Sequence, residues 1–357
     1  MGPTRGVHLR RTEDRGAAVD ALVARVGGGA GGRVGLAGVL ADLDRTARAV
    51  RVPSPAASWG FRWDREDSRS RRWWPQGITT SSDGGHLDGR LPSGLGPGRS
   101  VVVTSAYSRT LDGVNQGSRL SFVDVSDPGR LRYRHVLLVD PVRSPDGSLE
   151  VRPVRLHAGG IVWHGDHLYV AGTARGFATF RLDDVVAVPS EVPDVFGYRY
   201  VLPVRFGYDA RTEPGGSRMH YSFVSLDRGG PRPGLVTGEY GRGERSTRLA
   251  RYEIDHATGL LRADEDGGCH PVVLDDGVPG MQGAVVVDGT WYVTTSRGRF
   301  RLGSVWVGRP GRLQERRHRL PVGPEDISYW PEHDLLWSLS EYPWARYVFA
   351  IPRARLG

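Results

Sequence analysis

Acidic, imidazole and amide side chains recur in this sequence at one kind of position, where a short apolar or small-residue segment begins. Carboxyls and imidazoles can transfer protons near neutral pH, and amides can orient a polar ligand. The residues at these positions are Gln76, His157, His220, Gln282, Glu325 and Asp326. Because the positions are equivalent, they predict an internal repeat that would bring these side chains together in space.

A second set of polar residues follows the next apolar segment of each repeat. It includes guanidinium groups, which can bind a carboxylate, phosphate or enolate through forked hydrogen bonds. The second set is Tyr107, Arg109, Arg175, Glu239, Arg242, Arg297, Glu341 and Tyr342. Four of the repeats place an arginine here, and the last repeat places Glu341.

The elements that must position these residues are short strands. First strands are expected at 76–80, 157–162, 220–224, 282–286 and 325–329, with second strands at 101–105, 168–172, 234–238, 291–295 and 335–339. Third and fourth strands follow in most repeats, but the last repeat ends without a fourth, which residues 59–63 could supply. The fold class is therefore predicted as all-β, a five-bladed β-propeller of four-stranded blades whose last blade is closed by an N-terminal strand. Six or seven blades are the main alternatives.

Propeller geometry converts the two sets into one predicted site, because first strands begin and second strands end on the same face of the ring. At that channel mouth we expect proton transfer by Glu325, His157, His220, Glu239 and Glu341. We expect substrate binding by Gln76, Arg109, Arg175, Arg242, Gln282, Arg297, Asp326, Tyr107 and Tyr342. The alternative interpretation is a polar ring that binds only water or neutralises itself in Arg–Glu pairs.

The first 57 residues differ from the rest and are expected to form a partly helical appendage. Helices are predicted over residues 12–26 and 34–50, and Pro53 and Pro55 would end the second one. Residues 58–357 then form the propeller. The 50 Gly and 24 Pro among 357 residues call for many turns, which argues against a helical bundle. The 32 aromatic residues favour strands and argue against a disordered chain.

Charge and cysteine content narrow the class of partner. The net charge is +8, but all 48 basic residues are Arg, spread along the chain and interleaved with 40 acidic residues, so nucleic-acid binding is not predicted. Cys269 is the single cysteine, which excludes an intramolecular disulfide. The sequence contains no apolar stretch long enough to cross a membrane and no export-type leader, so a cytoplasmic protein is expected. Its oligomeric state is left open.

A metal site is an alternative that the spacing of the repeats leaves open, although no cofactor is predicted. His157, His220, Glu325 and Glu341 are of the types that hold a transition ion. Asp326 with the oxygens of Gln76 and Gln282 would suit calcium.

Several segments together resemble a family of actinobacterial (Streptomyces-type) propeller proteins, usually labelled hypothetical or secreted. These are WPQGITT at 74–80, SFVD at 121–124, HAGGIVW at 157–163, SFVSLD at 222–227, MQGA at 281–284 and PEDISYW at 324–330. The resemblance covers the chain from about Trp59 and implies the fold, and export in some relatives, but no particular activity. A weaker likeness, carried by Gln76 and Gln282, joins the chain to the five-bladed glutaminyl cyclases.

The leading hypothesis is a cofactor-independent enzyme that acts on a small polar or anionic molecule at the channel mouth. Acid/base chemistry fits best, as in a cyclase, lyase, isomerase or hydrolase of actinobacterial specialised metabolism. The alternative is a non-catalytic propeller that binds a glycan, peptide or protein partner through exposed Trp73, Trp74, Trp330 and Trp344. A carboxyl or His of perturbed pKa in an enclosed mouth would favour the enzyme.

Overall fold

The computed structural model describes residues 6–27, 31–85, 89–144 and 146–356, and in them strands predominate. The helices are short: α1 (Gly16–Val26), α2 (Gly35–Ala41) and α3 (Arg65–Arg69). Short 3-10 turns lie at Leu182–Asp184, Pro331–His333 and Arg353–Arg355. The all-β class predicted from the turns and aromatic residues is confirmed.

Most strands belong to antiparallel meanders of four, each ordered from the centre outward. The first is β6 (Trp73–Thr80), β7 (Val101–Ser108), β8 (Ser118–Asp124) and β9 (Arg132–Arg143), and the second is β11 (Ile161–His164), β12 (His167–Ala171), β13 (Gly176–Arg181) and β15 (Tyr200–Thr212). Next come β16 (Phe223–Asp227), β17 (Gly234–Gly238), β18 (Arg248–Glu253) and β20 (Val273–Asp276). They are followed by β21 (Met281–Val287), β22 (Thr290–Thr295), β23 (Leu302–Gly308) and β24 (Gln314–Val322). The chain ends with β25 (Pro324–Trp330), β26 (Leu335–Ser340) and β27 (Val348–Pro352).

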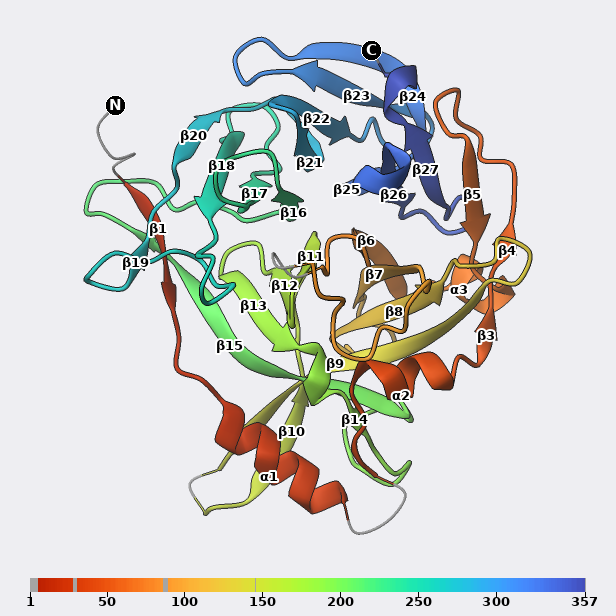
Figure 1. Cartoon of the computed structure of the whole chain (residues 1–357), viewed down its shortest axis with the longest axis vertical. Helices are drawn as coiled ribbons and strands as arrows, with labels where there is room; N and C mark the ends of the chain where they lie inside the picture. Colours follow the sequence, from red (N-terminus) through yellow and green to blue (C-terminus); the bar gives the residue numbers. More distant parts are fainter. Residues whose placement is uncertain (1–5, 28–30, 86–88, 145, 357) are drawn as a thin grey trace.

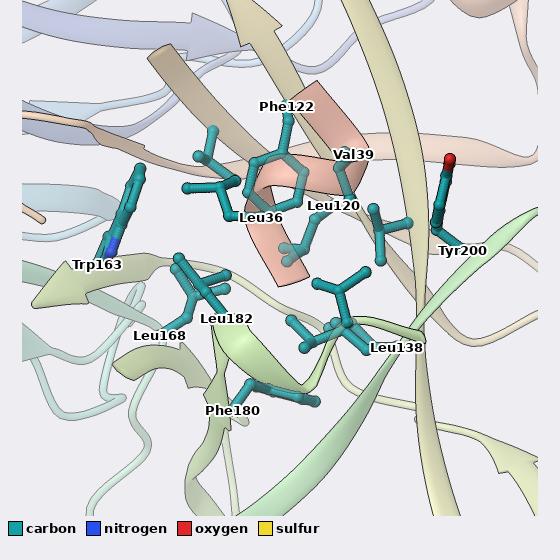
Figure 2. Packing of buried hydrophobic residues seen from close by; sticks show 14 of the residues in the cluster. Leu36, Val39, Leu120, Phe122, Leu138, Trp163, Leu168, Phe180, Leu182 and Tyr200 are labelled. Atoms are coloured by element: carbon teal, nitrogen blue, oxygen red, sulfur yellow. The ribbon is translucent and has the colours of Figure 1, made fainter. Parts of the chain in front are cut away.

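The meanders are arranged around a central axis (Figure 1), as in a β-propeller. The innermost strands contact one another in sequence order, β6 with β11, then β16, β21 and β25, and β25 contacts β6 again. An apolar core fills the space between successive sheets. Between the first two meanders, for example, Phe122, Leu138, Trp163 and Phe180 form one buried cluster with Leu36 of α2 (Figure 2).

Burial on both faces explains why the inner strands read as continuous apolar runs rather than as an alternating pattern. Every residue of β6 is buried, and so are all but one of the residues of β7. In a propeller each sheet is covered by its neighbour on either side, so neither face needs polar residues.

The end of the chain pairs with a strand from near its beginning. Strand β5 (Trp59–Arg62) lies antiparallel to β27, with Phe61 opposite Val348 and Trp59 opposite Ala350. This is the pairing that the sequence predicts for residues 59–63. It covers the edge that β27 would otherwise expose.

The segment before β5 departs from the predicted pair of helices. α1 agrees with the first, but the second helix ends at Ala41 instead of reaching residue 50. Beyond it, β3 (Arg45–Thr46) pairs with β9, and β4 (Arg48–Ala49) pairs with β5. The prediction of a helix there was wrong because these residues satisfy their backbone groups on the free edges of outer strands.

Further short strands extend the outer edge of the first two meanders. They are β1 (Val7–Arg11), β2 (Gly32–Arg33), β10 (Leu149–Pro153), β14 (Val186–Ala187) and β19 (Gly268–Cys269). The long outer strands β9 and β15 also pair with each other in parallel, which joins these two meanders into one sheet. The candidate functional site lies away from these outer strands, on the innermost and second strands of the meanders.

Candidate functional site

Polar residues from three innermost strands and two second strands meet at one mouth of the ring. Gln76 of β6 donates from Nε2 to Oε2 of Glu341 at 3.3 Å, and Gln282 of β21 donates from Nε2 to Oε1 of Glu325 at 3.0 Å. Tyr342 is a further hydrogen-bond partner of Glu341. We call the following residues the mouth cluster: Gln76, Tyr107, Gln282, Glu325, Glu341 and Tyr342.

β-Bulges in the inner strands set the direction of three of these side chains. The register of β6 against β7 shifts between Pro75 and Ile78, which places Gln76 in a β-bulge. Equivalent shifts place Gln282 in a bulge of β21 and Glu325 in a bulge of β25. A bulge turns a side chain away from the regular alternation, so the same irregularity in three inner strands directs three polar groups to one mouth.

Burial raises the pKa values of both glutamates of the mouth cluster. Burial raises the pKa of Glu325 well above its usual value, and the negative charges of Glu341 and Asp326 raise it further. Only 2% of Glu325 is exposed, and among the described residues its carboxyl accepts a side-chain hydrogen bond only from the amide of Gln282. Burial also raises the pKa of Glu341, although hydrogen bonds from Tyr342 and Gln76 act against this. A carboxyl with a raised pKa can donate or accept a proton closer to neutral pH than an ordinary glutamate.

Aromatic rings line the mouth around the carboxyls. The rings of Tyr107 and His157 lie 4.6 Å apart, and burial together with the nearby Glu341 raises the pKa of Tyr107 to about 12. His157 is exposed, yet it is crowded by protein, and this desolvation lowers its pKa. Trp74 packs edge-on against Tyr342, and the Arg109 guanidinium lies 5.1 Å from the centre of the Trp74 ring. The structure thus brings His157 and Arg109 to the predicted mouth.

Asp326 lies next to Glu325 but is directed into the ring rather than toward the mouth. Its Oδ2 accepts hydrogen bonds from the backbone N–H groups of Ile78 and Ile161 at 3.1 and 3.3 Å, and the residue is fully buried. It therefore ties β25 to β6 and β11. The equivalent positions of β6 and β21 are Gly77 and Gly283, where a Cβ would meet backbone of the adjacent inner strand within 3 Å. Asp326 holds the ring together and does not reach a ligand at the mouth.

Glu239 and His220, both predicted to transfer protons, lie in a different arrangement. Glu239 accepts hydrogen bonds from the Arg248 guanidinium at 2.9 Å, from the Ser246 hydroxyl and from the backbone N–H of His220. Burial opposes ionisation, but these hydrogen bonds lower the pKa of Glu239 to about 2. The His220 side chain is exposed. Glu239 is thus a fixed anion that holds its loop, and it is unsuited to act as a general acid.

The other predicted arginines also have local roles. Arg242 donates to the backbone oxygen of Ser296 at 2.8 Å, and Arg297 pairs with Glu315 of β24 at 3.1 Å. Arg175 is exposed and lines a separate surface pocket of about 580 Å³, whose lining includes none of the mouth cluster. The structure therefore does not gather these three side chains around Glu325.

Of the tryptophans proposed for partner binding, Trp73, Trp74 and Trp330 are buried, and only Trp344 is exposed, at 60%. The expectation of an exposed aromatic surface made from all four was wrong, because three of the indoles fill space between the sheets or beneath the mouth. One exposed ring does not make an extended surface for a glycan or peptide.

Sequence reasoning missed Arg346, which lies beneath the mouth. Its Nε donates to the backbone oxygen of Glu341 at 2.8 Å, and its Nη1 donates to the backbone oxygen of Asp67 at 2.6 Å. The guanidinium carbon lies 5.9 Å from the centre of the Trp74 ring. Arg346 follows the turn after β26, outside the two repeated positions, so no repeat signal marked it.

A second buried polar cluster, also missed, surrounds Asp67 of α3. Its carboxylate accepts hydrogen bonds from Arg119 at 2.5 Å, from Tyr133 at 2.7 Å and from His135 Nε2 at 2.8 Å. The Ser121 hydroxyl lies 2.8 Å from His135 Nδ1, which completes a Ser–His–Asp series. Ser121 is 4% exposed and lines a cavity of about 10 Å³, which has room for one water at most. Asp67, Arg119 and His135 also line a pocket of about 290 Å³, whose lining does not include Ser121. The series fastens α3 to the first meander, and its hydroxyl faces only the small cavity.

Metal-binding geometry is not a feature of the described part of the chain. Within it, no group of three or more His, Cys, Asp or Glu residues is arranged to hold an ion. Likewise, none of its helices is long and apolar enough to span a membrane.

The meanders around one axis and the polar mouth define a β-propeller with paired carboxyls at its channel. No protein-family model matches the chain, and no curated protein matches it significantly. Among solved structures, it is similar to the β-propeller domain of Cps50 (Swd1) from Myceliophteria thermophila, at 10% identity, 86% of this chain, 99% of that chain and a TM-score of 0.39. It is also similar to a gluconolactonase from Xanthomonas campestris, at 13% identity, 87% and 86% coverage and a TM-score of 0.34.

A third similar structure is a GH43 β-1,3-galactosidase with galactodeoxynojirimycin, at 12% identity, 80% of this chain, 94% of that chain and a TM-score of 0.38. All three TM-scores are below 0.5, so these likenesses add nothing to what the sheet topology and the mouth establish by themselves.

Proposed function

We propose that this protein is an enzyme that transfers a proton to or from a small polar molecule at the channel mouth, without a cofactor. The observation that carries the proposal is the pair Glu325 and Glu341. Both carboxyls have raised pKa values, and each is hydrogen-bonded by an amide from a neighbouring inner strand. Burial also raises the pKa of Asp326, a carboxyl that ties inner strands together. The raised pKa values of Glu325 and Glu341 therefore support a functional site only together with their position at the mouth.

In this proposal Glu325 is the general acid, because it is the more deeply buried carboxyl and has the strongly raised pKa. Glu341, with hydrogen bonds from Gln76 and Tyr342, is the more easily ionised partner and serves as the base. The amides and phenols of the mouth cluster orient the substrate. This division of roles suits hydrolysis, elimination, isomerisation or cyclisation.

The proposal includes a count of five blades. The closed series of contacts from β6 through β11, β16, β21 and β25 back to β6 supports it, as does the pairing of β5 with β27. In a ring of this size Gln76 and Glu341, which are 265 positions apart, become neighbours only because the last blade meets the first.

The experiment is a comparison of wild-type protein, Glu325→Gln and Arg297→Ala on a panel that represents each reaction class. Suitable probes are 4-nitrophenyl glycosides and lactones for hydrolysis, a glutaminyl dipeptide for cyclisation and 2-hydroxy acids for elimination. Glu325→Gln should lower kcat by about 10²-fold or more on the substrate that wild-type protein converts. Arg297→Ala is the matched control, because Arg297 pairs with Glu315 of the outer strand. Unchanged turnover by folded Glu325→Gln would contradict the assignment.

A further inference from the structure

A pocket of about 570 Å³ lies beside the strands that close the ring. Its lining includes Arg48 of β4, Arg62 of β5, Arg65 and Arg69 of α3, and Trp344 of the turn after β26. None of the mouth cluster lines it, so it is separate from the site proposed for catalysis. Pockets of this size commonly hold small molecules.

The lining of this pocket carries an excess of positive charge. It contains four arginines and one carboxylate, that of Asp64. The Asp64 side chain is already bound, because it caps α3 and pairs with Arg45 at 2.8 Å. Arg48, Arg65 and Arg69 are exposed, and within the described ranges none of the three forms an ion pair with a carboxylate. Their guanidinium groups are therefore available to an anion from outside.

Trp344 presents an indole ring beside these arginines. The residue is 60% exposed, and the guanidinium carbon of Arg69 lies 4.1 Å from the centre of its ring. Its backbone has a φ of 74°, which is strained for a bulky residue. Two hydrogen bonds hold it there: its N–H donates to the backbone oxygen of Ser68 at 3.0 Å, and its carbonyl oxygen accepts from Arg62 Nη2 at 2.5 Å. The fold thus keeps a large ring in solvent at a conformational cost, and such strain is often found at ligand sites.

We propose that this pocket binds a small molecule that carries both a phosphate group and a planar aromatic ring, as a mononucleotide does. Guanidinium groups bind phosphate oxygens through paired, charge-assisted hydrogen bonds, which is the role of Arg48 and Arg65. Trp344, with Arg69 against its ring, stacks on the planar part of the ligand. A simple anion would make no use of the indole, and a neutral aromatic molecule would leave the arginines without a partner. This site is additional to the channel mouth and does not depend on catalysis there.

The test is calorimetric titration of the full chain with adenosine 5′-monophosphate, adenosine and inorganic phosphate at constant ionic strength. The mononucleotide should bind about tenfold or more tightly than either of its parts, because each part makes its own contacts. Trp344→Gly should weaken its binding by about tenfold through the loss of stacking, without loss of stability, because glycine adopts this φ freely. Arg65→Gln should weaken it by about tenfold through the loss of a phosphate contact. Arg312→Gln is the control, because Arg312 is an exposed arginine between β23 and β24 that does not line the pocket, and this variant should bind like wild-type protein.

Labelling with ¹⁵N-tryptophan locates the binding in the wild-type protein. The mononucleotide should shift the indole N–H resonance of Trp344, which is assigned by its absence from Trp344→Gly. The inference is overturned if that resonance does not move, or if folded Trp344→Gly and Arg65→Gln bind like wild-type protein. Inorganic phosphate that bound as tightly as the mononucleotide would also overturn it, and so would a short oligothymidylate that bound more tightly, since the pocket would then belong to nucleic acid. The failure of the proposed function is distinct: Glu325→Gln would keep normal turnover, while the mononucleotide still bound at Trp344.

Discussion

Two polar clusters of this propeller are each built around a buried carboxyl, Asp67 in one and Glu325 in the other, but they stabilise opposite protonation states. Around Asp67, hydrogen-bond donors from four side chains converge on one carboxylate, those of Arg45, Arg119, Tyr133 and His135. Burial acts to raise the pKa of Asp67, but the charges of Arg119 and His135 outweigh it and hold the pKa well below the usual value. At the mouth, Glu325 has a single amide donor and acidic neighbours, and its pKa is raised.

This difference in pKa distinguishes a cluster that stabilises the fold from a site whose carboxyls can transfer protons. The Asp67 cluster is electrostatically matched within the protein, so it gains nothing from a ligand. At the mouth, burial raises the pKa values of Glu325 and Glu341, and no guanidinium forms an ion pair with either carboxyl among the described residues. A bound substrate can change the protonation free energy of carboxyls that the fold does not stabilise with an opposite charge.

The largest effect should come from removing the strand on which both regions depend. Deleting residues 1–64 removes β5, which covers β27, and Arg45, which lies 3.4 Å from the Asp67 carboxylate. The remaining chain should aggregate or fail to fold, because a sheet edge is exposed and the ring is left open. Size-exclusion chromatography and thermal unfolding measure this. A monomer that melts like the parent would show that closure does not depend on β5.

A single substitution should next distinguish the two carboxyl environments. Asp67→Asn leaves the buried Arg119 without its carboxylate and should reduce the free energy of unfolding by about 3–5 kcal/mol, as breaking a buried ion pair does. Urea denaturation measures the loss. Glu66→Gln is the control, since the exposed Glu66 side chain contacts Arg45 only at the surface and should cost about 0–1 kcal/mol. Equal effects of the two variants would mean that the Asp67 cluster contributes little.

Glu325→Gln should have a smaller effect, of opposite sign. Because the folded-state pKa of Glu325 is raised, the folded protein binds more protons than the unfolded chain, and stability falls as the pH rises from about the usual 4.5 through the raised value. The uncharged glutamine removes that loss. The variant should therefore melt about 2 °C or more above the parent at pH 7–8, and not at pH 4. Melting curves over this pH range test it, and a variant less stable at pH 8 would contradict it.

The repeat made much of this site predictable. Gln76, Gln282 and Glu325 occupy equivalent places in sequence, and in the structure Gln76 meets Glu341 and Gln282 meets Glu325. The inward direction of Asp326 could not be predicted, because it depends on bulges that break the regular alternation of β25.

Other residues were misassigned because partners distant in sequence, or in neighbouring loops, decide their roles. Glu239 stands at an equivalent position to Glu341, yet Arg248 and Ser246 fix it as an anion, and Glu315 holds Arg297 at an outer strand. Arg346 and Asp67 carry no periodic signal. Their roles arise from contacts between α3 and the end of the last meander, 279 positions apart.

The most direct test of the account is the protonation state of Glu325 in the wild-type protein. Carbon-13 labelling of the glutamate carboxyl groups, with Glu325→Gln used to assign the resonance, allows its titration to be followed by NMR. The account predicts that Glu325 stays protonated to well above the usual glutamate pKa of 4.5. A Glu325 carboxyl that ionises at or below that value would contradict the assignment of the mouth as a proton-transfer site.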